Sequence, residues 1–389
     1  MGLDSMRTGA WLNPGRVRAY LRVLAAANAL SLLWLLVGAS EGLDPQGRLL
    51  GTDFVSFWAA GVVVQAGANP YDSAVHIAAE SAVWQAQQGY TAFFYPPLFL
   101  LWCAPLGLLG YFSALATWLG ATGAAFMAAL RFWESRLPLM ALAAFPPLLI
   151  TLTHGQTSFL LAALLGGGFA ALAQGRASLA GVMFGLAAFK PQFGVLVPVV
   201  LLAGRQWRTI GVATLTVVGS AILATAAFGA GIWSEWQAVA APAQDAMAGG
   251  AIGFGKMQSL FAALRLLGIS TGLAYVAQGL LAVAVALALG YAAWKRGPGK
   301  EVGATALVGA LLATPFVLDY DFVLLAFPLA LIAHSKPRAW ERTVAALAFV
   351  VPAFSRPLGV LVGIPLAPLV VVALFVLLFL RAIKEPAAR

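Results

Sequence analysis

Charged residues, cysteine and histidine are all scarce in this chain. Only 10% of its 389 residues are charged, whereas 61% are apolar and the mean hydropathy is +0.90. A soluble domain of this length cannot bury so much apolar surface, so the composition indicates a polytopic membrane protein. The single cysteine, Cys103, excludes an internal disulfide and a cysteine-based metal cage. The three histidines show no spacing typical of a metal site.

Common cofactor and targeting motifs are also missing. The sequence contains no P-loop, no Rossmann fingerprint, no G-x-S-x-G elbow and no short-period repeat. We expect no cleavable signal peptide, because residues 21–37 form a first transmembrane helix without an A-x-A site behind it. The net charge of +9 does not indicate a nucleic-acid partner. Lysines and arginines lie mainly in short clusters between apolar runs, as the positive-inside rule expects.

The distribution of charge predicts the orientation of the chain. The N-terminus is basic, whereas residues 40–95 carry five acids against Arg48 alone, so we expect this loop outside the cytoplasm. The segment 98–130 could form a hairpin at Pro105 and Gly110. If it crosses once instead, the later basic clusters all fall inside, and residues 230–256 form a second outer loop.

We therefore expect a single all-α membrane domain over residues 1–389, with about twelve crossings and both termini in the cytoplasm. After 21–37, the apolar segments are 98–130, 138–153, 157–174, 178–189, 193–203, 210–229, 273–293, 302–317, 322–333, 343–354 and 358–380. Several are shorter than the roughly 20 residues that a crossing needs, so some helices should be broken or tilted. On this topology the polar residues discussed next gather at one membrane face.

Asp53 begins the most informative polar segment, residues 53–61. Phe54, Phe57 and Trp58 follow it as one apolar face of a short interfacial helix that should end near Gly61. Such a helix would hold the carboxylate at the membrane surface. The alternative is that Asp53 only caps the helix, which is ordinary chemistry for an aspartate in this position.

Two tyrosines and a histidine lie in turns on the same expected face. Tyr71 and Asp72 end a turn-forming Asn-Pro-Tyr-Asp sequence, and Tyr95 precedes two prolines. Both tyrosines could contact a sugar or anchor the protein at the interface, and anchoring is the more common role. His154 begins a turn between two apolar segments. It could bind a phosphate or relay a proton, or lie in a solvated hairpin tip.

Cations and acids also interrupt the later apolar runs. Lys190, followed by Pro191 and Gln192, splits a run of about 26 residues, where a lysine needs water or an anion unless it snorkels to the interface. Gln258 and Arg265 are expected on one helix face, and the arginine requires a carboxylate or phosphate partner. In the sequence 319–321, two aspartates could bind a metal or polyol hydroxyls, or cap the helix that follows.

Together these segments resemble glycosyltransferase family 87, membrane mannosyltransferases and relatives of the GT-C class that use polyprenyl-phosphate sugars. The resemblance runs from about residue 50 to 335. It is carried by Asp53-Phe54 with Phe57-Trp58 and Gly61, Asn69-Pro70-Tyr71-Asp72, Tyr95-Pro96-Pro97-Leu98, Gly155-Gln156 with Ser158, Lys190-Pro191-Gln192, Gln258-Ser259-Leu260 with Arg265, and Asp319-Tyr320-Asp321. Met257 departs from the asparagine expected there, and residues 316–318 lack a histidine that some relatives carry.

The resemblance implies a GT-C helix bundle and an inverting transferase whose catalytic base is Asp53. It also implies a polyprenyl-phosphate-linked sugar donor, with mannose as the family's usual sugar, and a glycolipid or glycan acceptor. Donor-phosphate binding is expected from Lys190, Arg265, Gln258 and His154. Sugar or acceptor binding is expected from Tyr71, Asp72, Tyr95, Gln156, Gln192, Asp319, Tyr320 and Asp321. We expect no cofactor and no metal.

The expected location is a bacterial inner membrane, with the site on the extracytoplasmic side and membrane lipids as further partners. A lipid or sugar-lipid transporter is the alternative function, since it would share the size and charge pattern. A transporter more often has its polar residues at mid-bilayer or at both faces, whereas an enzyme needs one outer cavity. A purely structural scaffold would leave Lys190 and Arg265 unexplained.

Overall fold

The computed structural model describes residues 2–84, 91–137 and 139–384, and in these ranges the chain is helical with three isolated β-bridges and no strand. The first half contains α1 (Leu3–Thr8), α2 (Pro14–Val37), α3 (Phe54–Gln65), α4 (Ser73–Ser81), α5 (Pro97–Cys103), the 3₁₀ helix η1 (Leu106–Leu108), α6 (Tyr111–Trp133), α7 (Leu139–Ala144), α8 (Pro146–His154), α9 (Ser158–Ala173), α10 (Ala177–Leu186), η2 (Ala187–Phe189), α11 (Pro191–Gly194) and α12 (Val197–Ala203).

The second half continues with longer helices and two further 3₁₀ helices. These are α13 (Trp207–Phe228), α14 (Ile232–Ala248), η3 (Phe254–Lys256), α15 (Leu260–Leu266), α16 (Thr271–Arg296), α17 (Lys300–Ala313), η4 (Asp319–Leu325), α18 (Ala326–His334), α19 (Glu341–Val362) and α20 (Ala367–Lys384). The expected all-α architecture is thus confirmed for the described residues.

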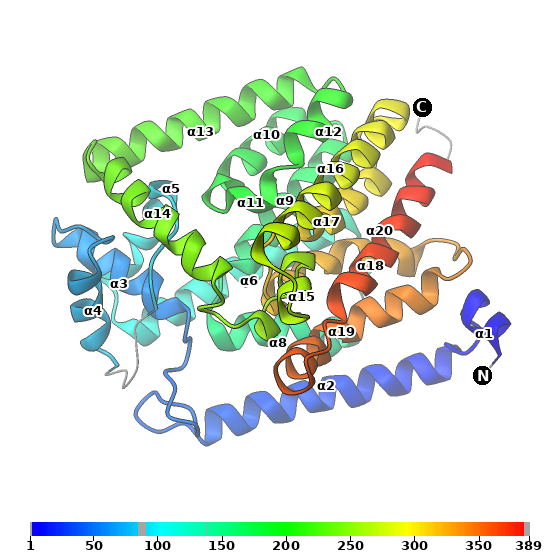
Figure 1. Ribbon diagram of the computed structural model, residues 1–389, viewed down its shortest axis with the longest axis horizontal. Coiled ribbons are helices and arrows are strands. Elements are labelled where there is room, and N and C mark those ends of the chain that lie inside the picture. The colour runs from blue at the N-terminus through cyan, green and yellow to red at the C-terminus, as the bar shows by residue number, and fades with distance from the viewer. Residues whose placement is uncertain (1, 85–90, 138, 385–389) are drawn as a thin grey trace.

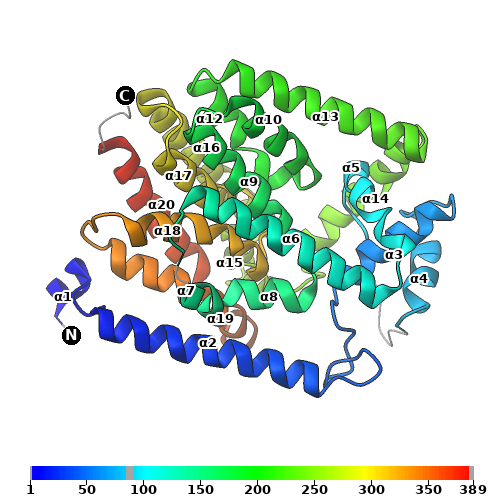
Figure 2. The ribbon, with the colours of Figure 1, turned by 180° about the vertical axis from the view of Figure 1, so that it is seen from behind.

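Helices α2 and α13 run along the length of the molecule, and the short helices are distributed over its middle and both ends (Figures 1 and 2). Helix α2 forms one side and α13 the opposite side, with α9, α16 and α17 between them. Helices α3 and α4 lie at one end, close to the start of α14, and both chain termini lie at the other. Helices α3 and α4 and the start of α14 therefore lie at the end of the molecule opposite the termini.

The core is built around two short apolar helices. In α9 every residue from Ser158 to Leu172 is buried, and in α17 every residue from Val302 to Leu312 is buried. Helix α9 packs against α6, α10 and α17, and α17 packs against α16 and α20. A helix that is apolar on all sides is buried either in lipid or in a protein core, and α9 and α17 are buried among other helices.

Within the described residues, six helices are long and apolar enough to cross a membrane: α2, α6, α13, α16, α19 and α20. The twelve expected crossings are not confirmed, because the other six expected segments form shorter helices. Helix α9, for example, has 16 residues and α17 has 14. At 1.5 Å per residue such helices reach only about 21–24 Å, less than a hydrocarbon core of about 30 Å. The predicted boundary between the last two segments also moves, since α19 continues through Ser355, Arg356 and Pro357.

The segment 98–130 is neither a continuous helix nor a simple hairpin. It contains the seven-residue α5, the short η1 and then α6, which alone is long enough to span. Helix α3 crosses the end of α5 and η1 so closely that a Cβ atom added to Gly61 would lie 2.2 Å from the carbonyl oxygen of Cys103 and 2.9 Å from the backbone nitrogen of Gly107. Gly61 is therefore a close-contact residue within α3, and the prediction that the helix ends there is wrong.

The prediction that the helix after Asp53 lies at the membrane interface is also wrong. Phe54, Phe57 and Trp58 are all buried inside the protein. Phe57 makes edge contacts with Tyr95, Phe99 and Trp118, at centroid distances of 5.2 to 6.1 Å. These aromatic residues therefore pack α3 against α5 and α6 instead of facing a membrane surface. The start of α3 is consequently fixed by tertiary packing.

Candidate active site

Asp53 immediately precedes α3, and its side chain does not cap that helix. The carboxylate makes no hydrogen bond to the backbone N–H groups of the first turn, so the capping alternative is wrong. Its backbone N–H instead donates to the carbonyl oxygen of His154, at 3.0 Å, and thereby joins the start of α3 to the end of α8. The residue is half-buried. The carboxylate therefore points to another part of the molecule.

Gln156 is the residue that holds the Asp53 carboxylate. Its Nε2 donates to Asp53 Oδ2 at 2.8 Å. Its Oε1 accepts from the Thr157 N–H at 2.7 Å, the Thr157 hydroxyl at 3.0 Å and the Tyr95 hydroxyl at 3.1 Å. Three donors on one oxygen determine which way the amide points, so the NH₂ group must face Asp53. Gly155, at φ +66°, makes the turn that places Gln156 here.

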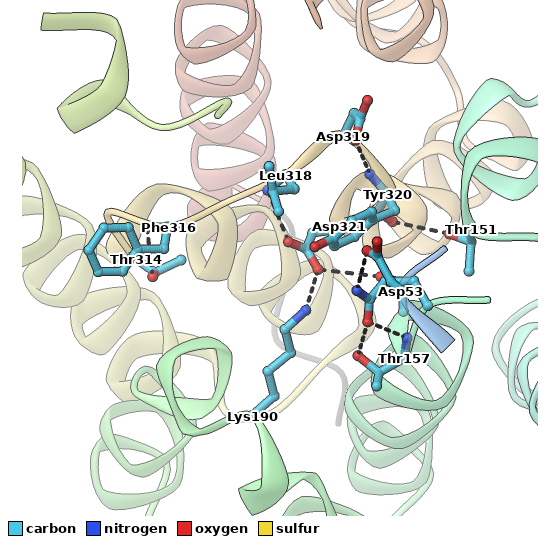
Figure 3. A network of polar contacts seen from close by, with 12 residues as sticks. Asp53, Thr151, Thr157, Lys190, Thr314, Phe316, Leu318, Asp319, Tyr320 and Asp321 are labelled. Atoms are coloured by element: carbon cyan, nitrogen blue, oxygen red, sulfur yellow. Dashed lines mark hydrogen bonds and ion pairs between the residues drawn. The ribbon is translucent and has the colours of Figure 1, made fainter. Parts of the chain in front are cut away.

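Lys190 forms a buried ion pair with Asp321, as Figure 3 shows. The Nζ–Oδ1 distance is 2.7 Å, and the two side chains are 8% and 2% exposed. The ammonium also lies over the rings of Phe193 and Tyr320, at 5.0 and 5.4 Å from the centroids. Burial lowers the pKa of Lys190, but the Asp321 carboxylate raises it, and the net shift is upward. The lysine is therefore charged at neutral pH.

Asp321 connects this ion pair to the segment that carries Gln156. Its Oδ1 also accepts from the hydroxyl of Ser158 at 3.3 Å, and its Oδ2 accepts from the backbone N–H of Leu318 at 3.0 Å. Residues 156–158 thus contact Asp53 through Gln156 and Asp321 through Ser158. A single turn between α8 and α9 organises both acids (Figure 3).

Asp319 points away from Asp321, although the two are only two residues apart (Figure 3). Its Oδ2 lies 3.3 Å from Nη1 of Arg356, and its Oδ1 accepts from the backbone N–H of Tyr320 at 3.1 Å. Each aspartate therefore has its own cation. The Tyr320 ring lies beneath the Lys190 ammonium, and the centroid of the His154 ring is 6.2 Å from it.

His154 ends α8 in a half-buried position. Its Nδ1 lies 2.8 Å from the carbonyl oxygen of Ile150, one turn earlier, so Nδ1 carries the proton in this contact. Residues 155–158, which follow it, are buried. The hairpin-tip alternative is therefore wrong for this turn. The Nε2 atom has no hydrogen-bond partner among the described residues.

Gln258 and Arg265 do not share a helix face, which corrects that prediction. Helix α15 begins only at Leu260, so Gln258 lies in the extended segment before it. Its backbone N–H donates to the carbonyl oxygen of Val317, close to the 319–321 segment. Arg265 donates to the carbonyl oxygen of Ile269 at 2.8 Å and lies over the ring of Phe254, at 4.9 Å.

The remaining predicted residues lie at different distances from this centre. The Tyr71 hydroxyl donates to the carbonyl oxygen of Tyr95 at 2.8 Å, so both tyrosines pack inside the protein. Asp72 is exposed and caps α4 by accepting from the N–H groups of residues 74 and 75. Gln192 is exposed on α11. The structure brings together Asp53, Tyr95, Gln156, Lys190, Asp319, Tyr320 and Asp321, with His154 beside them.

Sequence reasoning gave no role to three residues that this centre contains. Thr157 and Ser158 follow Gln156 directly, and their hydroxyls bind Gln156 and Asp321. Arg356 pairs with Asp319 from α19. A signal for Arg356 existed, since it is a lone arginine between two apolar runs.

The profile of glycosyltransferase family 87 matches residues 93–315, which is more than half of the 389 residues. The chain belongs to glycosyltransferase family 87. It is accordingly a glycosyltransferase, and the enzyme class is confirmed over the transporter alternative. No curated protein and no solved structure matches the chain. The range matched by the family 87 profile includes Gln156, which hydrogen-bonds to Asp53, and Lys190, which pairs with Asp321. Asp53 and Asp321 themselves lie outside that range.

Proposed function

We propose that the enzyme transfers a sugar from a polyprenyl-phosphate donor to a hydroxyl of a glycolipid or glycan, with Asp53 as the general base. The observation that supports this role is the environment of the Asp53 carboxylate. One oxygen is held by Gln156, the side chain does not cap α3, and it makes no ion pair within the described residues. A half-buried carboxylate that is oriented but not neutralised is suited to accept a proton.

The transfer step follows from these positions. Asp53 takes the proton from the acceptor hydroxyl while that oxygen forms a bond to the anomeric carbon. The bond from this carbon to the phosphate oxygen breaks, and the electron pair leaves with the lipid phosphate on the opposite side of the sugar. The configuration is thereby inverted. Cations stabilise the charge that develops on the phosphate, and Lys190 and Arg265 are proposed for this, with the neutral Gln258 amide as a further hydrogen-bond donor. Gln156 binds Asp53 and Tyr95 binds Gln156, so these two residues, together with Tyr320, are proposed to contact the sugars.

An apolar cavity supports a lipid-linked substrate. It has a volume of about 610 Å³ and lies among α5, η1, α6, α9 and α10, with Trp118, Ala125, Leu164 and Met183 in its lining. Trp118 adjoins the candidate active site, because its indole N–H donates to the carbonyl oxygen of Gly155 at 3.1 Å. We propose that the prenyl chain occupies this cavity while its phosphate lies near Lys190.

The location and the sugar are further parts of the proposal. The acidic loop 40–95 against a basic N-terminus favours a site on the extracytoplasmic face. Short loops and helices rich in alanine, leucine and glycine favour a bacterial inner membrane. Mannose is proposed as the sugar because it is the usual one in the family that the sequence resembles.

The test is Asp53→Asn, assayed with a panel of radiolabelled polyprenyl-phosphate sugars. Asparagine keeps the size and still accepts from Gln156, but it cannot take a proton. We expect turnover to fall by about 10²–10⁴ while donor binding is retained. Asp245→Asn is the matched control, because Asp245 is an exposed acid on α14. Transfer by Asp53→Asn at more than about a tenth of the wild-type rate would contradict a general-base role.

A further inference from the structure

Arg356 is a charged residue inside an apolar helix. Helix α19 has a mean hydropathy of 1.8 over its most apolar window, and Arg356 lies six residues before its last residue, Val362. At 1.5 Å per residue this is about 9 Å from the helix end. A charge at that depth is unfavourable unless it meets a counter-ion, and intramembrane charges generally mark binding sites or ion pairs. The position therefore requires a functional or structural explanation.

The ion pair that Arg356 forms is much looser than the one formed by Lys190. Lys190 lies 2.7 Å from Asp321, and both side chains are at least nine-tenths buried. Arg356 lies 3.3 Å from Asp319 through one nitrogen, and its side chain is 33% exposed. A pair that is longer, single and partly exposed is weaker and exchanges its partner more readily.

Most hydrogen-bond donors of Arg356 remain available. A guanidinium has five N–H donors, and only the contact to Asp319 is present among the described residues. The other cations considered for anion binding are more constrained. Lys190 is neutralised by Asp321, and Arg265 binds a carbonyl oxygen and stacks on Phe254. A planar guanidinium recognises phosphate, as it does carboxylate, through two parallel hydrogen bonds.

We propose that Arg356 binds the phosphate group of a lipid-linked substrate, and that Asp319 occupies the guanidinium until this phosphate displaces it. The choice of a lipid phosphate rests on the proposed function. The phosphate belongs either to the sugar donor or to a phosphorylated lipid acceptor. Arg356 lies beside the candidate active site, because its partner Asp319 also accepts from the N–H of Tyr320 and the Tyr320 ring contacts the Lys190 ammonium. The position is therefore compatible with a phosphate from either substrate.

The two partners of this ion pair have opposite effects on binding. Arg356→Ala removes the cation, and we expect the KM of the phosphate-bearing substrate to rise about 10- to 150-fold. Asp319→Asn removes the competing negative charge, and we expect the same KM to fall by about 1.5- to 5-fold. Arg356→Lys should lie between wild type and Arg356→Ala, since it keeps the charge without the fork of donors. If the ion pair were purely structural, Arg356→Ala and Asp319→Asn would both raise this KM.

The experiment measures KM separately for the donor and the acceptor, together with melting of each purified variant in detergent. A rise in donor KM alone assigns the phosphate to the donor, and a rise in acceptor KM alone assigns it to the acceptor. Stabilisation of the protein by sugar-free polyprenyl phosphate is a readout that needs no transfer. Wild type should be stabilised and Arg356→Ala should not.

The inference is overturned if Arg356→Ala is stabilised as well as wild type, or if Asp319→Asn weakens binding as Arg356→Ala does. Failure of the proposed function gives a different result. In that case wild type transfers sugar from no polyprenyl-phosphate donor, while polyprenyl phosphate can still stabilise wild type and not Arg356→Ala.

Discussion

The buried pair of Lys190 and Asp321 permits a test that separates folding from phosphate binding. Lys190→Met keeps most of the length of the side chain but removes its charge. Within the described residues, the buried Asp321 carboxylate then keeps only Ser158 and Leu318 as donors. Removing one partner of a buried ion pair costs about 3–5 kcal/mol of unfolding free energy. This corresponds to a shift of about 150- to 5,000-fold in the unfolding equilibrium.

The double variant Lys190→Met/Asp321→Asn should recover most of that loss. The asparagine oxygen can still accept from the Leu318 N–H while the amide NH₂ faces the Ser158 hydroxyl oxygen, which can accept, and no unpaired charge remains. We expect its stability within about 1–2 kcal/mol of wild type. Asp321→Asn alone should be less stable than the double variant, because it leaves a buried ammonium beside a neutral amide.

The assay compares melting of the four purified proteins in detergent with their donor kinetics. A stable double variant with a raised donor KM supports Lys190 as a phosphate ligand. A double variant no more stable than Lys190→Met would refute the reasoning from buried charge. Wild-type donor kinetics in the double variant would remove Lys190 from the phosphate site and leave it a structural residue.

Two further predictions concern packing and orientation. Gly61→Ala should destabilise the protein by about 1–3 kcal/mol or more, because its Cβ would meet the backbone at the end of α5. Gly123→Ala on α6 is the control and should be neutral or stabilising, because nothing lies within 4 Å of its Cβ. Equal melting temperatures of the two variants would contradict the close approach of α3 to α5 and η1. Cysteines replacing the exposed Asp72 and Asp245 in a Cys103→Ala background should react with an impermeant thiol reagent from outside, and cysteines replacing Arg176 and Arg205 should not. Reaction of Arg176→Cys from outside would reverse the orientation.

Most residues of the candidate active site can be predicted from the sequence, because charge and polarity are conspicuous in an apolar chain. Asp53, Lys190 and the 319–321 segment all stand out for this reason. Their pairing does not follow from the sequence. Asp319 and Asp321 are two residues apart, yet one pairs with Arg356 on α19 and the other with Lys190 between η2 and α11. Pattern alone cannot choose between these partners, because both acids follow the same apolar run.

Composition is enough to predict a helical membrane protein, since a chain with 61% apolar residues is more stable in a lipid bilayer, where helices satisfy the backbone hydrogen bonds, than in water. It does not establish which apolar segments cross. Residues 157–174 have the composition of a crossing, but α9 is a short helix buried on every side, because neighbouring helices can replace lipid around it. The role of Asp53 within the fold is likewise decided by tertiary contacts. Local sequence allows a helix cap, whereas Gln156, 103 residues away, holds the carboxylate, because the turn after α8 is packed against the start of α3.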